Sequence, residues 1–125
     1  MSTDTALILF AHGARDPQWA EPFQAVRTAI ARRAPGVAVE LAFLELMSPS
    51  LGEAVDRVVA RGARRVVVVP AFMAQGGHLK RDLPRLIGEV QAVHPRCVIE
   101  QTRAIGEVPE IIEAIAAFAL AQTGS

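Results

Sequence analysis

Two histidines follow apolar segments of this chain that are suited to the strands of a parallel sheet. His12 comes directly after residues 6–11, and His78 follows residues 66–73 and the pair Gly76–Gly77. In an open α/β sheet, ligands bind in the crevice outside the carboxyl ends of the strands. Two neutral imidazoles that face one cleft are suitable ligands for a divalent metal ion. If the two strands are neighbours, the sequence predicts a metal-handling site at this edge of the sheet.

A carboxylate is the third candidate ligand. Glu45 follows the short apolar stretch 42–44, at the expected carboxyl end of another strand. If that strand lies beside the first one, Glu45 reaches the same edge as His12. Two imidazoles and one carboxylate suit Co²⁺, Fe²⁺, Ni²⁺ or Zn²⁺, and three protein ligands leave positions open for a substrate. The competing interpretation is that His12 satisfies backbone groups in a turn and that Glu45 is a solvated loop carboxylate.

Small and basic residues surround these candidates. Gly13 frees the backbone for a sharp turn after the strand, and Gly76 and Gly77 allow close approach of a backbone or a ligand. Four basic residues flank the histidine segments or follow the last strand pattern: Arg15, Lys80, Arg81 and Arg103. They are suited to binding the carboxylates of an anionic substrate. A solvated basic rim explains them equally well.

The composition describes one globular domain. With 125 residues, of which 51% are hydrophobic, the chain is long enough to bury a core. Lys plus Arg and Asp plus Glu number 13 each, so the charge balance predicts neither nucleic acid nor an acidic membrane as a partner. The longest apolar runs are about half of a membrane-spanning helix, and we find no secretory signal. We therefore expect a cytoplasmic protein whose single domain spans residues 1–125.

Two further residues predict structure rather than chemistry. Cys97 is the one cysteine, which excludes an internal disulfide and any cysteine-based metal site within one chain. It lies in a short apolar stretch, so we expect a buried, unreactive thiol. His94 precedes Pro95 at the end of a helix pattern, and we interpret it as a helix-terminal or surface residue.

A strand pattern followed by a helix pattern occurs four times. The expected strands cover residues 5–11, 37–44, 65–72 and 97–102, and the most apolar of these are unbroken runs, as in strands buried on both faces. Such alternation implies right-handed crossovers and a parallel sheet with helices on both faces. We favour the strand order 2-1-3-4, in which His12 and His78 flank the reversal point. Four strands make a small sheet, so pairing into a homodimer is plausible.

The helix patterns carry recognisable boundaries. Asp16 and Pro17 are a capping residue and a first-turn proline, Ser50 and Glu53 have capping-box spacing, and Gly62 stands where a helix would end. Pro84 is tolerable only in the first turn of the third helix.

Four apolar stripes at helical spacing are predicted to be core contacts. Their members are Trp19, Phe23, Val26 and Ile30; Leu51, Ala54, Val55, Val58 and Val59; Leu83, Leu86, Ile87 and Val90; and Val108, Ile111, Ile112, Ile115 and Phe118.

Three segments together resemble a known family. Residues 7–17 (LILFAHGARDP), 43–51 (FLELMSPSL) and 69–84 (VPAFMAQGGHLKRDLP) are similar to the first three strand-and-loop motifs of the CbiX-type chelatases. These belong to the class II chelatases of cobalamin and sirohaem biosynthesis. The resemblance covers nearly the whole chain in the same order, and the three segments are specific only in combination.

The resemblance implies a fold, a reaction and a set of residues. The fold would be a single-domain, chelatase-like (flavodoxin-like) three-layer sandwich that forms a homodimer. The reaction would be lyase-type insertion of Co²⁺ or Fe²⁺, with Ni²⁺ a third candidate, into sirohydrochlorin, a tetrapyrrole with many carboxylates. The metal would be a substrate, and no tightly bound cofactor is implied. By the same resemblance, His12 and His78 are catalytic and bind metal, and Glu45 is the supporting metal ligand.

The resemblance also implies residues that contact the tetrapyrrole: Gly13, Ala14, Arg15, Gly76, Gly77, Lys80 and Arg81. The family often has serine where this chain has Ala14, so a hydroxyl hydrogen bond from that position is absent here.

Three other functions fit parts of the sequence. A non-catalytic metal or tetrapyrrole carrier would use the same ligands without turnover. A histidine phosphotransferase would need an arginine where this chain has Ala11, so the phosphate clamp is missing. A flavodoxin-like regulatory module would need an early acidic pair or a Ser/Thr-rich first loop, and the chain has neither.

Overall fold

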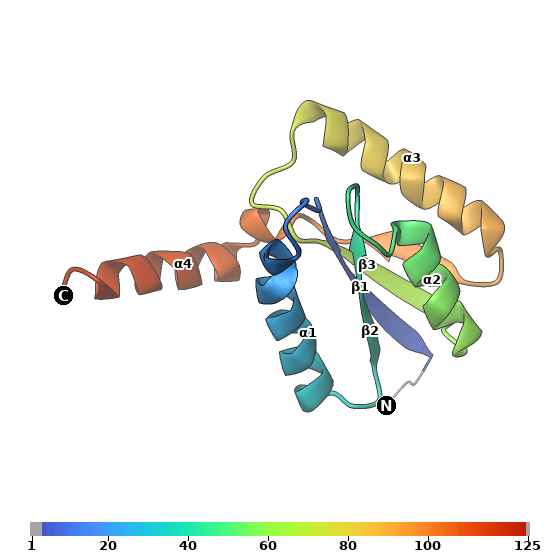
Figure 1. Ribbon diagram of the computed structural model, residues 1–125, viewed down its shortest axis with the longest axis horizontal. Helices are drawn as coiled ribbons and strands as arrows, with labels where there is room; N and C mark the ends of the chain where they lie inside the picture. The colour runs from blue at the N-terminus through green and yellow to red at the C-terminus, as the bar shows by residue number, and fades with distance from the viewer. Residues whose placement is uncertain (1–3, 125) are drawn as a thin grey trace.

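The computed structural model describes residues 4–124, and it forms one four-stranded parallel sheet with helices around it (Figure 1). The strands lie in the order β2-β1-β3-β4, as predicted. In chain order the elements are β1 (Thr5–Ala11), the 3₁₀ helix η1 (Pro17–Ala20), α1 (Glu21–Arg33), β2 (Ala38–Phe43), α2 (Leu51–Ala60), β3 (Arg65–Pro70), α3 (Gly77–Val93), β4 (Val98–Gln101), the 3₁₀ helix η2 (Ile105–Glu107) and α4 (Pro109–Ala121).

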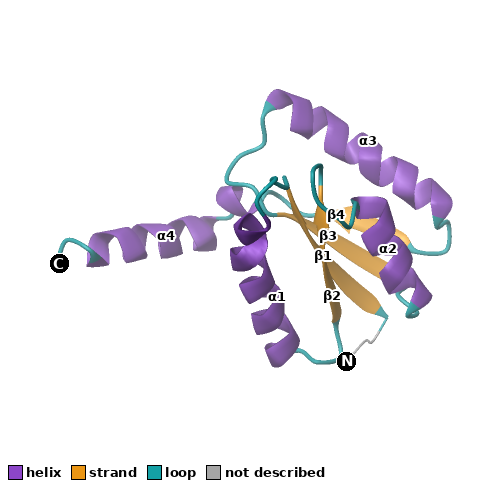
Figure 2. Ribbon diagram, viewed as in Figure 1, coloured by secondary structure: helices purple, strands orange, loops and turns teal. Residues whose placement is uncertain are grey.

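The sheet is the middle layer of three, with α1 on one face and α2 and α3 on the other (Figure 2). Alternate residues of β1 divide between the two cores. Ile8 and Phe10 are buried against the α2 and α3 face, whereas Leu9 faces α1. Burial on both faces explains why the central strand is an unbroken apolar run.

The strand register brings three loops to one edge. β1 is central, and Ala11 pairs with Phe43 of β2, while Phe10 pairs with Pro70 of β3. The carboxyl ends of these three strands therefore lie within one or two residues of each other. The loops that follow β1, β2 and β3 leave the sheet side by side.

The start of α2 has the predicted capping box. The Ser50 hydroxyl accepts from the Glu53 backbone N–H at 3.2 Å, and the Glu53 carboxylate accepts from the Ser50 N–H at 2.9 Å. These hydrogen bonds lower the pKa of Glu53. The helix ends before Gly62, whose φ of +103° lies in the left-handed region that favours glycine, also as predicted.

The strand ends differ slightly from the prediction, and α1 begins later. The expected strands 37–44, 65–72 and 97–102 are one or two residues too long at their ends. Strand propensity continues past the last ladder hydrogen bond, so pattern alone overshoots. Asp16 caps the short helix η1, and α1 starts only at Glu21, with Pro22 in its first turn. Of the α1 stripe, Val26 is 48% exposed and was wrongly assigned to the core.

The prediction that Pro84 lies in the first turn of its helix is wrong. α3 already begins at Gly77, so Pro84 is inside the helix and His78 is in the first turn. An interior proline costs about 3 kcal/mol. Burying the side chains of α3 offsets this, at roughly 1.5–3 kcal/mol each. The buried residues of α3 are Leu79, Leu83, Ile87 and Val90.

The apolar stripe of α4 was predicted to be core, and this is also wrong. α4 extends away from the sheet, and among the residues described it packs mainly on η2 (Figure 1). None of its residues is buried, and Ile115 and Phe118 are 45% and 71% exposed. Helical spacing identifies a face that needs covering, but it does not tell whether the same chain provides the cover.

Cys97 is buried and is a free thiol, as predicted. Desolvation by burial raises its pKa above the usual value, so the thiol stays protonated near neutral pH.

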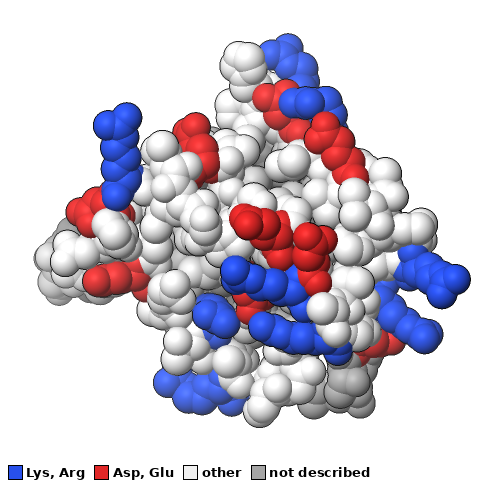
Figure 3. Space-filling view, turned by 45° about the vertical axis from the view of Figure 1, so that its right-hand side comes forward, with Lys and Arg blue, Asp and Glu red and all other residues white. Residues whose placement is uncertain are grey.

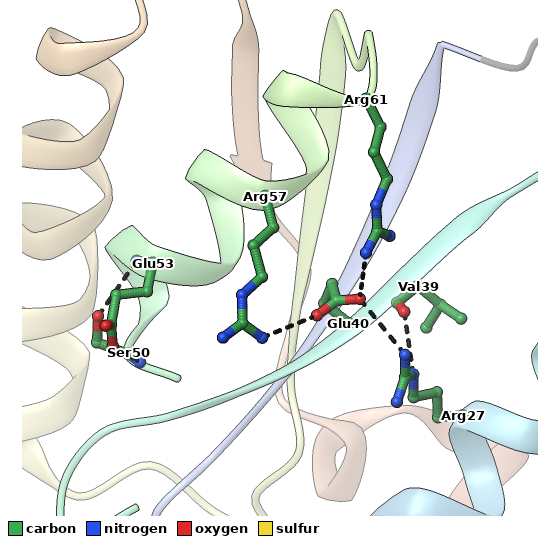
Figure 4. Close-up of polar contacts among 7 residues, drawn as sticks. All are labelled: Arg27, Val39, Glu40, Ser50, Glu53, Arg57 and Arg61. Carbon is green, nitrogen blue, oxygen red and sulfur yellow. Dashed lines mark hydrogen bonds and ion pairs between the residues drawn. The ribbon is translucent and has the colours of Figure 1, made fainter. Parts of the chain in front are cut away.

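A buried carboxylate joins three elements at the outer edge of the sheet (Figure 4). Glu40 of β2 is 5% exposed and forms ion pairs with Arg27 of α1, Arg57 of α2 and Arg61 at 3.4, 3.4 and 3.3 Å. Arg27 also donates from Nε to the carbonyl oxygen of Val39 at 3.1 Å. Since β2 has a strand on one side only, this guanidinium covers an unpaired edge. Nothing in the sequence analysis identified this cluster.

Elsewhere the surface carries both signs of charge. Acidic and basic side chains are interspersed on the face shown in Figure 3, with no extended patch of one sign. This agrees with the equal numbers of acidic and basic residues in the sequence. Among the residues described, no helix is long and apolar enough to cross a membrane.

We predict that Glu40→Gln lowers the free energy of unfolding by about 1–2 kcal/mol. The three arginines are half exposed and recover solvation, but the hydrogen bonds to a buried charge are lost. Urea denaturation measures the change. Glu89→Gln is the matched control, because Glu89 forms only an exposed ion pair with Arg85 at 3.6 Å and should change stability very little. Equal stability of both variants would contradict a structural role for Glu40.

Candidate active site

The first two loops at the carboxyl edge continue the pairing of β1 and β2. The Leu44 N–H donates to the Ala11 carbonyl at 2.9 Å, and the Glu45 N–H donates to the His12 carbonyl at 3.1 Å. These two hydrogen bonds join the loops directly beyond the ends of the strands. They fix the backbones of His12 and Glu45 next to each other, as the sequence analysis expected.

Gly13 makes this close approach possible. Its φ is +95°, and a Cβ atom at this position would lie 1.9 Å from the carbonyl oxygen of Glu45. Both the backbone conformation and the space exclude any other residue without rearrangement. The structure uses the predicted backbone freedom of Gly13, although the chain bends only at residues 15 and 16. In the same loop Leu46 has a φ of +67°, which is uncommon for a residue with a side chain.

His78 reaches the edge from the first turn of α3. Gly76 is the N-cap of this helix, Gly77 is its first residue, and the His78 side chain is exposed. A Cβ atom on either glycine would meet nothing within 4 Å. No protein backbone approaches these glycines, so they border open space rather than a close packing contact.

The imidazole of His12 lies against an aromatic ring. The centroids of His12 and Phe72 are 4.5 Å apart with an interplanar angle of 52°. Phe72 is 4% exposed, whereas His12 is exposed. The predicted strand had included Phe72, and its contact with His12 was missed. An aromatic residue just past the end of a strand, beside a histidine at the end of the neighbouring strand, is the signal that was available.

The basic residues predicted for the rim are all exposed. Arg15 follows β1, Lys80 and Arg81 lie in the first turns of α3, and Arg103 follows β4. Solvent exposure at this edge leaves their charges available to an anionic ligand.

The chain does not by itself assemble a closed metal site. Within residues 4–124, no three His, Cys, Asp or Glu side chains lie close enough together to hold a metal ion. His12, Glu45 and His78 share one edge of the sheet, but they are not gathered around a common point in the isolated chain.

Other chemistry-bearing features lie away from this edge. His94 ends α3 at its far end, and its Nε2 lies 2.7 Å from Oδ1 of Asp56, which agrees with a helix-terminal role. A cavity of about 690 Å³ lies beside it at the amino ends of β3 and β4. Parallel sheets bind ligands at the opposite edge, so we place the candidate active site at His12, Glu45 and His78.

The fold and this edge define an open parallel α/β protein with histidines at the carboxyl ends of its strands. The profile of one family, CbiX, matches residues 6–119. The chain belongs to the CbiX family.

Curated relatives agree with this membership. The chain is 34% identical over 86 residues to the sirohydrochlorin cobaltochelatase of Methanococcus aeolicus. These aligned residues cover 69% of this chain and 60% of that protein. It is 39% identical over 82 residues to the sirohydrochlorin cobaltochelatase of Saccharolobus islandicus, covering 66% and 62%. The matched segment therefore spans about three fifths of the length of these relatives.

Solved structures share the fold. The CbiX protein of Marinobacter aquaeolei superposes with a TM-score of 0.85 at 31% identity, covering 96% of this chain and 98% of that one. The sirohydrochlorin chelatase SirB from Bacillus subtilis subspecies spizizenii, in complex with cobalt, superposes with a TM-score of 0.77 at 24% identity. The match covers 91% of this chain but 49% of SirB, so the fold described here corresponds to about half of that protein.

We predict that Gly13→Ala lowers the free energy of unfolding by at least about 2 kcal/mol, because the new methyl group adds left-handed strain to a clash with the Glu45 carbonyl. Thermal or urea unfolding measures this loss. Gly52→Ala is the matched control: a Cβ there meets nothing within 4 Å, so alanine should be neutral or stabilising in α2. A Gly13→Ala protein as stable as the Gly52→Ala protein would show that the two loops are not in contact.

Proposed function

We propose that this chain is a sirohydrochlorin metallochelatase, a lyase-type enzyme that inserts Co²⁺ or Fe²⁺ into a carboxylated tetrapyrrole. One observation carries the proposal: the loops after β1 and β2 and the start of α3 present His12, Glu45 and His78 at one open edge of the sheet. Two relatives that are 34% and 39% identical to this chain over the aligned residues are named sirohydrochlorin cobaltochelatase, which supports the proposal.

Metallation requires that the metal loses water beside the ring and that two pyrrole N–H protons leave. A neutral histidine is a suitable proton acceptor near neutral pH. We assign proton removal to His12, which also contacts the metal. His78 and Glu45 complete the metal ligands. Imidazole and carboxylate accept Co²⁺, Fe²⁺ and Ni²⁺ alike, so the metal in this proposal is a substrate chosen largely by supply.

The rim of the site suits a flat polyanion. Arg15, Lys80 and Arg81 would bind the ring carboxylates, and such charge-assisted hydrogen bonds fix orientation as well as adding affinity. The open space beside Gly76 and Gly77 leaves room for the macrocycle. Gly13 and Ala14 are small residues beside His12. Ala14 offers no hydroxyl, so this position contributes contact area alone.

The same proposal includes a homodimer in the cytoplasm. α4 is apolar on most sides and exposed, and a helix of this kind is normally buried. A helix of 13 residues is about 20 Å long. If half of its circumference is buried, α4 loses roughly 300 Å² of accessible surface. In a dimer, two such helices and the two surfaces on which they pack together bury roughly 1,200 Å². This area is enough for a specific protein–protein interface. A second copy would also supply ligands that the single chain does not gather.

We predict multiple-turnover metallation of sirohydrochlorin by the purified protein. Co²⁺, Fe²⁺ and Ni²⁺ are added in parallel, and the change in tetrapyrrole absorbance is followed against the spontaneous rate. His12→Ala and His78→Ala should each reduce kcat by at least about 100-fold, because each removes a proton acceptor or a metal ligand. Glu45→Gln tests the carboxylate in the same assay.

His94→Ala is the control for this assay, since it removes a histidine that lies outside the site. It should retain the wild-type rate. Wild-type rates in both His12→Ala and His78→Ala would remove the site assignment. Tight binding of Co²⁺ or sirohydrochlorin without turnover would show that the protein is a metal or tetrapyrrole carrier and not an enzyme.

We predict that the double variant Ile115→Asp/Phe118→Asp is monomeric, whereas the wild-type protein has the mass of two chains in sedimentation analysis. Charges on α4 would have to be buried without partners in the dimer. Val93→Asp is the control, because Val93 is an apolar residue of α3 that is 68% exposed, close to the 71% of Phe118. A monomeric wild-type protein, or dissociation by Val93→Asp alone, would contradict the role of α4.

A further inference from the structure

The ring of Phe72 forms a fixed wall for the imidazole of His12. Besides the 4.5 Å contact with His12, Phe72 packs edge-on against Phe10 with centroids 6.0 Å apart. Phe10 is fully buried. The core therefore packs against the inner side of the Phe72 ring, and the imidazole of His12 lies against the same ring.

The backbone of Phe72 is held in turn by η2. The Gly106 N–H donates to the Phe72 carbonyl at 3.0 Å. A Cβ atom on Gly106 would lie 1.7 Å from the carbonyl oxygen of Met73 and 2.4 Å from its Cα. The two backbones are therefore in direct contact, and the contact requires glycine for reasons of space. A larger residue would push the Phe72–Met73 segment away.

η2 is the base of α4, and it is anchored in the core. Ala104, which precedes η2, has no exposed surface. Its N–H donates to the Glu107 carboxylate at 3.2 Å, so η2 closes on itself before α4 begins at Pro109. A continuous set of contacts thus leads from the start of α4 through Gly106 and Phe72 to His12.

We propose that Phe72 and Gly106 are positioning residues for His12: Phe72 sets the orientation of the imidazole, and Gly106 sets the position of Phe72. The consequence for metallation rests on the proposed function, whereas the effect on the orientation of His12 does not. Orientation matters because His12 both binds the metal and accepts protons, so its imidazole must point at the metal and at the tetrapyrrole at once. A misplacement of about 1 Å can lower a reaction rate by about 100-fold.

The first experiment substitutes the ring. Phe72→Leu removes the aromatic face at similar volume, and Phe72→Tyr keeps it. Phe23→Leu is the control, because Phe23 packs against Trp19 in the core on the other face of the sheet, with ring centroids 4.9 Å apart. The Cε1–H resonance of His12 is recorded by two-dimensional NMR. The chain has only three histidines, so single substitutions assign each resonance, and His78 and His94 act as internal references. Thermal unfolding verifies that each variant is folded.

Because an aromatic ring at this distance shifts the resonance of a neighbouring proton, Phe72→Leu should move the His12 resonance, and Phe72→Tyr and Phe23→Leu should leave it in place. In the metallation assay, Phe72→Leu should lower kcat by about tenfold or more with KM changed by less than about twofold, and Phe72→Tyr should restore the rate. A His12 resonance that is unmoved by Phe72→Leu, or that moves as far in Phe23→Leu, would overturn the proposal.

The second experiment tests the contact with η2. Gly106→Ala should move the His12 resonance and lower kcat by about 100-fold in a protein that still folds. Gly88→Ala is the matched control, because a Cβ on Gly88 of α3 meets nothing within 4 Å. An unshifted resonance with a wild-type rate in Gly106→Ala would overturn the role of Gly106.

The two readouts separate the two proposals. The NMR measurements need neither metal nor tetrapyrrole, so they test the contact between Phe72 and His12, and its dependence on Gly106, even if the protein metallates nothing. If metallation proceeds but no variant moves the His12 resonance, the proposed function stands and the positioning role is wrong.

Discussion

The site depends on a backbone contact between two loops. The carbonyl of Glu45 occupies the space where any residue other than glycine at position 13 would have its Cβ atom. Because glycine leaves this space to the carbonyl, the two loops are hydrogen-bonded to each other directly beyond the strands, and the backbones of His12 and Glu45 are held side by side. The backbone positions of these two candidate metal-binding residues are thereby determined before any metal or tetrapyrrole binds, which is the condition for preorganised chemistry.

Much of the fold followed from local chemistry. Unbroken apolar runs predicted buried parallel strands, and their alternation with helix patterns predicted a parallel sheet with helices on both faces. The favoured strand order 2-1-3-4 is also the observed one. Ser50, Glu53 and Gly62 mark the ends of α2 through hydrogen bonds and a backbone angle that depend only on nearby residues. The same locality holds for His12 and Glu45, since parallel strands bring their carboxyl ends to one edge.

The errors concern interactions between segments that are distant in the sequence. Pro84 was expected near a helix start, but burial of Leu79 and Leu83 against the sheet outweighs its cost. The stripe on α4 is real, yet none of its residues is buried by the rest of the described chain. Glu40 and Phe72 were missed because their roles depend on residues far away in the sequence. Glu40 is an ion-paired carboxylate within a strand, and Phe72 lies against an imidazole of the neighbouring strand end. The closure of the metal site also exceeds what one chain determines.

The hydrogen bond from Arg27 to the carbonyl oxygen of Val39 blocks part of the free edge of β2 against pairing with a strand of another molecule. Further along the same strand, the Phe43 N–H donates to the Pro49 carbonyl at 2.9 Å, so the returning loop occupies that part of the edge. β4, at the other edge, has only four residues. Neither border of the sheet therefore offers a long template for an added strand, which protects a Val-rich protein against fibril-type growth. Association through helices remains open to it, and a contact in which two copies use the same helix surface closes at two subunits instead of propagating.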